Sequence, residues 1–313
     1  EGHMRILLPI DGSIYSDRAI EYICNRSALR EKTNTLYLLN VQKKVPAKAA
    51  QIIEKNELEG ILDDAAKEVL RPAKKALEAA GYKVKTKVAY GKATNRIVEY
   101  AKEIKANLIV MGSHGHTPVK NVLFGSKTSA VIASCKIPML VIRHKFKDEP
   151  GAMQVGVCLD GSEYSQSVMN YIIDNLPLLG KEPTFHLVNV VTPYSGILMP
   201  GVSAFGGPAM TAKEFESEQR SPFVDAAKPF YNKLRSEGYN VVIAELKGDP
   251  SEEISKYADE KKLGLLVMGT HGGGMIRIMM VGSTTMRVAC MTDLPILLIH
   301  KERVSKKSKT DKK

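Results

Sequence analysis

Tryptophan is absent from the 313-residue sequence, and cysteine occurs only four times. The cysteines lie far apart and form no C-x-x-C pair, so the sequence predicts neither a disulfide nor a zinc site. Cys24 lies in a helical pattern and Cys158 in an apolar run, where a small buried side chain is the expected role. No apolar run reaches about 18 residues, so no membrane-spanning helix is expected.

Length and composition indicate a globular protein of two domains. The chain is long for a single domain and fits two of about 150 residues, each large enough to bury its own core. Its 44% hydrophobic and 25% charged residues are typical of globular proteins rather than disordered or fibrous ones. The first residues, "EGHM", lack the basic segment and apolar core of a signal peptide and resemble a cloning remnant before Met4, so we expect a cytoplasmic protein.

The two halves of the sequence repeat one another. The segment "RILLPIDGS" at Arg5 returns as "QVGVCLDGS" at Gln154, an offset of 149 that also relates Val41 to Val190. Further along the offset is 157, so the second copy has gained residues within the Gly- and Pro-rich stretch 192–210, which has the composition of a loop. A repeat of this length predicts duplication of a whole domain rather than a solenoid.

Each copy alternates short apolar runs with helical patterns. Runs such as "NLIVMG" and "LGLLVMG" are apolar on successive residues, which is typical of strands covered on both faces in a parallel sheet. Residues 16–29 and 93–104 instead space their apolar side chains three and four apart, as helices do. The alternation predicts an α/β fold of two tandem doubly wound domains, each a five-stranded parallel sheet flanked by helices in a Rossmann-like arrangement.

The repeat also sets the expected domain boundaries. We expect one domain over residues 4–144 and a second over residues 152–301, joined by the short charged linker "KFKDEPGA". The basic residues 302–313 that follow are expected to be a disordered tail.

Each copy contains a glycine-rich loop between an apolar run and a helical pattern, with the spacing G-x2-G-x9-G-S. Its members are Gly112, Gly115, Gly125 and Ser126 in the first copy, and Gly269, Gly272, Gly282 and Ser283 in the second. Glycine lets backbone N–H groups approach an anion, and the N-terminus of the following helix adds further donors. The loop therefore predicts a phosphate site, with a tight turn and a serine helix cap as the alternative.

Two common phosphate-binding motifs do not fit this loop. In a Walker A loop lysine follows the last glycine directly, whereas Lys127 follows Ser126. The dinucleotide motif G-x-G-x-x-G would follow the first strand, where this chain has "DGS". Lys127 either meets a triphosphate or is a solvated lysine on a helix face.

Other candidate site residues lie at the expected carboxyl ends of strands. In open parallel sheets ligands bind in the crevice beyond these ends, where the strand order reverses. The residues so placed are Asp11, Val41 and Gly112 in the first copy, and Asp160, Val190 and Gly269 in the second. We expect each trio to converge on one site.

These motifs, together with "GDPSEEI" at Gly248, resemble the universal stress protein family over essentially the whole of both copies. The resemblance implies that each copy binds ATP, or ADP or AMP, and that Mg²⁺ can bind together with the phosphates. It implies that the Asp and Val of each trio hold the adenosine, while the three glycines and the serine of each loop hold phosphates. His114 and His271 lie in the loops and either line the sites or are exposed without a role.

The resemblance also bears on assembly. Sheets of this family commonly pair across domains through their last strands, which are "PMLVIR" and "PILLIH" in this sequence. We therefore expect the two halves to form an intramolecular pseudo-dimer, and two chains to be able to associate as a homodimer.

The loops offer little for catalysis. Hydrolysis of a triphosphate needs a positioned water or base, and neither glycine-rich loop contains a carboxylate. We assign no catalytic residue and no metal ligand, and expect a binding module in stress response or signalling. A slow ATPase and a nucleotide-free regulatory or interaction scaffold are the alternatives.

Charge is distributed unevenly along the chain. Residues 4–144 contain 24 Lys and Arg against 13 Asp and Glu, whereas residues 152–300 contain 12 against 16. Such asymmetry can indicate contact with nucleic acid or a membrane surface. No nucleic-acid motif accompanies it, and stretches such as "KVKTKVAY" fit the solvated face of a strand, so we expect neither partner.

Overall fold

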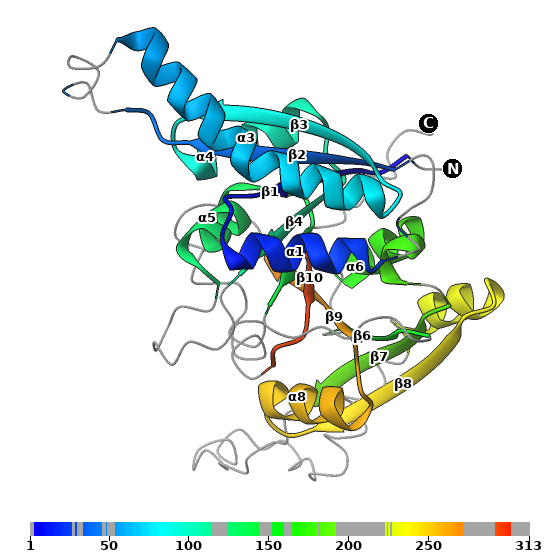
Figure 1. Ribbon diagram of the computed structural model, residues 1–313. Helices are drawn as coiled ribbons and strands as arrows, with labels where there is room; N and C mark the ends of the chain where they lie inside the picture. The colour runs from blue at the N-terminus through cyan, green and yellow to red at the C-terminus, as the bar shows by residue number, and fades with distance from the viewer. Residues whose placement is uncertain are drawn as a thin grey trace, which may run out of the picture.

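Ten strands form one sheet in the computed structural model (Figure 1). The structure describes residues 3–26, 34–45, 54–113, 124–143, 152–159, 165–180, 182–191, 227–271 and 292–301, with the single positions 29, 48, 223 and 225. The first half contributes β1 (Arg5–Pro9), β2 (Thr35–Gln42), β3 (Lys83–Tyr90), β4 (Leu108–Gly112) and β5 (Met139–Ile142). The second half contributes β6 (Gln154–Cys158), β7 (Thr184–Val191), β8 (Asn240–Lys247), β9 (Leu265–His271) and β10 (Ile296–Lys301). The strand order is β3-β2-β1-β4-β5-β10-β9-β6-β7-β8.

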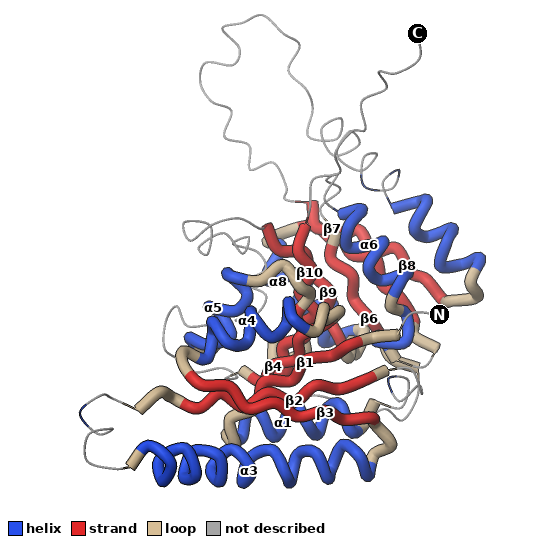
Figure 2. Tube along the Cα trace, turned by 90° about the horizontal axis from the view of Figure 1, so that it is seen from above, coloured by secondary structure: helices blue, strands red, loops and turns tan. Residues whose placement is uncertain are grey.

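Helices cover both faces of the sheet. They are α1 (Ile14–Cys24), α3 (Lys55–Ala79), α4 (Ala93–Glu103), α5 (Ser126–Ser134), α6 (Ser165–Asp174), the short 3₁₀ helix η2 (Leu176–Leu179) and α8 (Pro250–Glu260), and residues 227–236 are also helical. Figure 2 shows α1 and α3 on one side of the first half's strands, with α4 and α5 on the other. This layering confirms the expected α/β class and explains why β1 and β4 are apolar on successive residues, since both of their faces are buried.

One predicted helix is shorter than its pattern. The apolar spacing continues to residue 29, whereas α1 ends at Cys24. The N–H of Asn25, the C-cap residue, still donates to the carbonyl of Glu21 at 3.1 Å, but the N–H of Arg26 donates to the carbonyl of Ile23 at 3.1 Å, and this tighter i→i−3 bond ends the regular helical bonding. At the other end α1 begins at Ile14 because Ser13 caps it.

The two halves join through their last strands. Within each half all strand pairs are parallel, but β5 pairs antiparallel with β10, with Val141 opposite Ile296 and Met139 opposite Leu298. One apolar cluster continues across this junction, from Leu8 in β1 through Leu140 in β5 to Leu297 in β10. The expected pairing of the last strands is therefore confirmed.

The start of α8 differs from the start of its counterpart α4. The Asp249 carboxylate caps α8 by accepting the N–H groups of Ser251 at 3.1 Å and Glu252 at 3.2 Å. Lys92 occupies the N-cap position of α4 without a side-chain hydrogen bond. We expect Asp249→Ala to lower the free energy of unfolding by about 1 kcal/mol in urea titrations. Lys92→Ala is the matched control with little expected change, and equal losses in the two variants would contradict the capping role.

The structure also bears on the expected absence of a membrane-spanning helix and on the expected burial of the cysteines. Among the described residues, no helix combines the length and the apolar character that a membrane span requires. Cys24 and Cys158 are half-buried rather than fully buried, whereas Cys135 is buried. Cys290 lies outside the described residues.

Candidate functional site

The candidate site lies where the strand order of the first half reverses. From β1 the chain crosses to β2 on one side, whereas β4 pairs with β1 on the other side. Asp11 follows the carboxyl end of β1, Val41 lies near the end of β2, and Gly112 ends β4. The three residues line one cavity of about 160 Å³, so the expected convergence is confirmed for this half.

The turn between β1 and α1 holds the Asp11 carboxylate in place. Gly12 has a φ of 77°, in the left-handed region that favours glycine. Asp11 Oδ1 accepts the Ser13 N–H at 3.0 Å and the Ser16 hydroxyl at 3.2 Å. Ser13 Oγ in turn accepts the Ser16 N–H at 3.4 Å as the N-cap of α1. One carboxylate oxygen is thus bound within the turn, while Oδ2 is directed elsewhere.

The structure gives a reason for glycine at position 112 that differs from the expected one. The sequence pattern suggested that its missing side chain lets a ligand approach the backbone. In the structure, a Cβ at this position would lie 1.8 Å from the carbonyl oxygen of Tyr15 and 2.3 Å from its carbonyl carbon. Gly112 therefore allows the first turn of α1 to pack directly against the end of β4. The close approach is between two parts of the protein, and it shapes the wall of the cavity.

The start of α5 forms the second wall. Gly125 is the N-cap of α5 and donates its N–H to Ser113 Oγ at 3.1 Å, while the Ser113 N–H donates to the carbonyl of Ile142 at the end of β5. Ser126 is the first residue of the helix. The first-turn N–H groups of a helix have no partner within it, and the helix dipole is positive there. This end of α5 is therefore suited to an anion.

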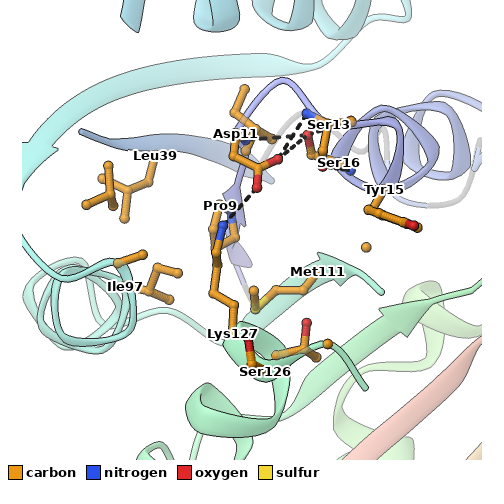
Figure 3. A pocket seen from close by; sticks show the side chains of 16 residues that line it. Pro9, Asp11, Ser13, Tyr15, Ser16, Leu39, Ile97, Met111, Ser126 and Lys127 are labelled. Carbon is orange, nitrogen blue, oxygen red and sulfur yellow. Dashed lines mark hydrogen bonds and ion pairs between the residues drawn. The ribbon is translucent and has the colours of Figure 1, made fainter. Parts of the chain in front are cut away.

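Lys127 connects the two walls. Its Nζ lies 2.8 Å from Asp11 Oδ2, and Figure 3 shows its side chain extending from α5 to the carboxylate. Partial burial raises the pKa of the Asp11 carboxyl, but hydrogen bonds from Lys127 and Ser13, with the Lys127 charge, outweigh burial and hold that pKa well below its ordinary value. Both side chains are nearly half exposed, 43% for Lys127 and 46% for Asp11, so salt screens their attraction.

The ion pair leads to a prediction about titration. Removing the ammonium group in Lys127→Thr is expected to raise the pKa of Asp11 toward its ordinary value, as measured by ¹³C NMR of the carboxyl carbon. A carboxyl with a lowered pKa in the folded chain adds stability above its unfolded pKa and loses it as pH falls through the folded value. The variant should therefore lose less stability than the unmodified chain on acidification. An unchanged Asp11 titration would show that the pair does not form in solution.

The cavity has an apolar part and a polar part. Pro9, Leu39, Val41, Ile97 and Met111 form the apolar part. The polar part consists of Asp11, Ser13, Ser16, Ser126, Lys127 and Thr128, with the backbone of Gly112 and Gly125. In Figure 3 Leu39 and Ile97 lie on one side of the ion pair and Tyr15 on the other.

Most of the residues proposed for the first site meet in this cavity. Asp11, Val41, Gly112, Gly125 and Ser126 all line it. His114 and Gly115 fall outside the described residues, and so their assignment stays a prediction.

The second half repeats part of this arrangement. Val190 lies near the end of β7, and Gly269 lies in β9, at positions equivalent to Val41 and Gly112. His271 was expected in the loop, but β9 continues to it because the parallel pairing with β10 extends to Lys301. Four other proposed residues lie outside the described part of the chain: Asp160, Gly272, Gly282 and Ser283.

A pair of asparagines shows that both halves build the same strand ends. The Asn40 side-chain amide donates to the carbonyl of Ile10 at 2.9 Å, and the Asn189 amide donates to the carbonyl of Leu159 at 2.8 Å. Ile10 directly precedes Asp11 in the sequence, and Leu159 directly precedes Asp160, its equivalent in the second half. Each bond ties the residue that follows the first strand of its half to the neighbouring strand, and in the first half it thereby helps to position Asp11.

Several residues of the site were not singled out from the sequence. Ser13, Ser16 and Thr128 line the cavity, and Asn40 donates a hydrogen bond to the carbonyl of Ile10, which also lines it. A usable signal existed for Asn40, because a polar residue recurs within an otherwise apolar run in "LYLLNV" and "FHLVNV". In the part of the chain that the structure describes, no three His, Cys, Asp or Glu side chains are grouped closely enough to hold a metal ion.

Comparisons with known proteins match both halves of the chain to one family. A model of the universal stress protein family matches residues 3–143 and again residues 152–300. Universal stress protein MJ0577 of Methanocaldococcus jannaschii is 31% identical over 158 residues, covering 46% of this chain and 96% of that protein. A universal stress protein of Mycolicibacterium smegmatis is 22% identical over 309 residues, covering 94% of this chain and 96% of that protein.

A solved structure supports the fold over the full length. A universal stress protein from Archaeoglobus fulgidus has a TM-score of 0.71 to this chain at 20% identity, covering 95% of this chain and 98% of that one. The two family matches lie in tandem and together span nearly all of the sequence. The chain therefore belongs to the universal stress protein family and carries two copies of the family's domain.

Proposed function

We propose that this chain binds an adenine nucleotide, ATP or its di- or monophosphate, in the first half and in the equivalent position of the second. Binding would serve signalling in a stress response rather than rapid turnover. A cytoplasmic location and association of two chains into a homodimer stay predictions from the sequence.

One observation carries the proposal: the cavity joins an apolar part to the N-terminus of a helix, which is suited to an anion, with a carboxylate between them. Leu39, Val41 and Ile97 provide a surface on which an adenine ring can be buried. Asp11 is suited to accept a hydrogen bond from a ribose hydroxyl, as acidic groups at strand ends do in nucleotide folds. The N-terminus of α5, with Ser126, is suited to the phosphates.

The size of the cavity is consistent with partial enclosure of the ligand. Its 160 Å³ is less than the roughly 300 Å³ at which ligand pockets usually begin. A nucleotide would therefore fill it with the base and ribose and leave its phosphates over the open start of α5. Mg²⁺, if it accompanies ATP, would be held mainly by phosphate oxygens and water, because this ion keeps several of its waters when it binds with a nucleotide.

The residues of the cavity favour binding over hydrolysis. Within the described part of the chain, Asp11 is the one carboxylate that lines it. Its oxygens accept hydrogen bonds from Ser13, Ser16 and Lys127, and its lowered pKa makes it a weak base. A general base for attack by water is therefore lacking among these residues.

The test is to denature the purified protein, identify any released nucleotide by mass, and titrate nucleotide-free protein with ATP, ADP, AMP and cyclic AMP by calorimetry. We expect saturable binding of at least one adenine nucleotide, with slow or no release of phosphate. Absence of binding for all four ligands would overturn the proposal and favour a nucleotide-free scaffold. Rapid release of phosphate would instead establish an ATPase.

A further inference from the structure

The ion pair between Lys127 and Asp11 lies across the proposed nucleotide pocket. Lys127 stands in the first turn of α5, and Asp11 follows β1, so the pair links the anion-binding end of the cavity to its carboxylate. Both residues line the cavity. A ligand that reaches from the apolar part to the start of α5 must therefore meet this pair.

The two oxygens of Asp11 are not equivalent. Oδ1 is held by the Ser13 N–H and the Ser16 hydroxyl within the turn, whereas Oδ2 accepts from Lys127 at 2.8 Å. A ribose hydroxyl that binds Asp11 from the cavity would share Oδ2 with the lysine, and this second hydrogen bond would weaken the ion pair. Lysine has a flexible four-carbon stem, so its ammonium group can leave the carboxylate and reach an anion at the start of its own helix.

The energy of that exchange depends on the charge of the ligand. An uncharged nucleoside would weaken the ion pair, and the ammonium group of Lys127 would then have only water as a new hydrogen-bond partner. A ligand with several phosphate charges would give it a charge-assisted hydrogen bond that replaces the one lost. The sequence equivalent of Lys127 in the second half is Thr284, which carries no charge.

We infer that Lys127 is a specificity-determining residue of the first pocket, which selects nucleotides with more phosphate groups over those with fewer. This inference rests on the proposed function. The two halves would then differ: the affinity of the first site would depend strongly on the number of phosphate groups, and the affinity of the second site would depend on it less.

The test needs a signal that belongs to the first pocket alone. Met111 lines the cavity, so its methyl group, labelled with ¹³C in the full-length chain and assigned with Met111→Leu, reports occupancy there by NMR. Adenosine, AMP, ADP and ATP are each titrated into the unmodified chain and into Lys127→Thr, which gives the first half the residue of the second. Lys127→Arg retains the charge, and Lys136→Thr removes an exposed lysine that does not line the cavity.

In Lys127→Thr we expect the Kd for ATP to rise about tenfold, while the Kd for adenosine is unchanged or lower. Added salt should weaken ATP binding more in the unmodified chain than in this variant. Lys127→Arg should retain most of the preference for ATP, and Lys136→Thr all of it. A ratio of adenosine to ATP affinity that is the same in the unmodified chain and in Lys127→Thr overturns the inference.

Other outcomes separate the inference from the proposed function. If Lys127→Thr weakens all four ligands equally, Lys127 has only a structural role and the inference fails while nucleotide binding stands. If no ligand shifts the Met111 signal in the unmodified chain or in the folded variants, nucleotide binding in the first half fails as well. Thermal unfolding of each variant verifies that it is folded.

Discussion

Replacing Gly112 with alanine is expected to abolish ligand binding in the first half and to lower the free energy of unfolding by about 3 kcal/mol or more. The added Cβ would lie 1.8 Å from the carbonyl oxygen of Tyr15, and a backbone atom cannot rotate away as a side chain can. The first turn of α1 must therefore move. Because Ser13 and Ser16 hold the Asp11 carboxylate, that movement also displaces Asp11 from the cavity.

Gly60 provides the matched control for this substitution. It lies exposed within α3, and a Cβ there meets nothing within 4 Å. Gly60→Ala is expected to leave binding unchanged and to raise stability by up to about 1 kcal/mol, because alanine favours the helix. Urea unfolding and the Met111 NMR signal measure both effects. A Gly112→Ala chain as stable as the unmodified one would show that α1 and β4 are not packed as described.

The layered fold was predictable because burial on both faces leaves a direct mark on the sequence. Strands such as β1 and β4 are apolar on successive residues, and helices such as α4 keep a spacing of three and four. The pairing of β5 with β10 was expected only through the family resemblance. Nothing in the apolar run of β5 itself distinguishes an antiparallel neighbour from a parallel one.

Parts of the site could be predicted, but the contacts between them could not. Strand ends and glycine spacing singled out Asp11, Val41, Gly112, Gly125 and Ser126, which line one cavity, and their contact with a nucleotide stays a prediction. The partner of Asp11 depends on how α5 packs beside β1, and 116 residues separate Lys127 from it. No local pattern records that contact.

Gly112 illustrates a second limit of prediction from the sequence. A glycine in a loop pattern is equally compatible with a nearby ligand and with a nearby backbone segment, since both require the absence of a side chain. The position of the Tyr15 carbonyl establishes the packing reason at Gly112. The approach of a ligand to the Gly112 backbone, which also lines the cavity, stays a prediction.

The final prediction concerns the number of sites in one chain. Gly125→Val should remove the first site, and Gly282→Val, at the equivalent position in the sequence, should remove the second. Gly125 has φ −47° and ψ 152°, a conformation open to any residue, so valine adds no backbone strain there. It adds a branched side chain at the cavity wall, where the phosphates are expected. Calorimetry with ATP should give two sites in the unmodified chain, one in each single variant and none in the double variant.

The two halves can be distinguished within the same set of chains. The NMR signal of Met111 should shift on addition of ATP in Gly282→Val and should not shift in Gly125→Val. Gly125→Ala should weaken ATP binding less than Gly125→Val, because the alanine side chain is smaller. An unmodified chain that binds one nucleotide, with a responsive Met111 signal, would mean that the second half kept the glycine spacing without the site. If Gly125→Val left Met111 fully responsive, the phosphates would have to lie away from the start of α5, and the anion-binding role assigned to that helix would be wrong.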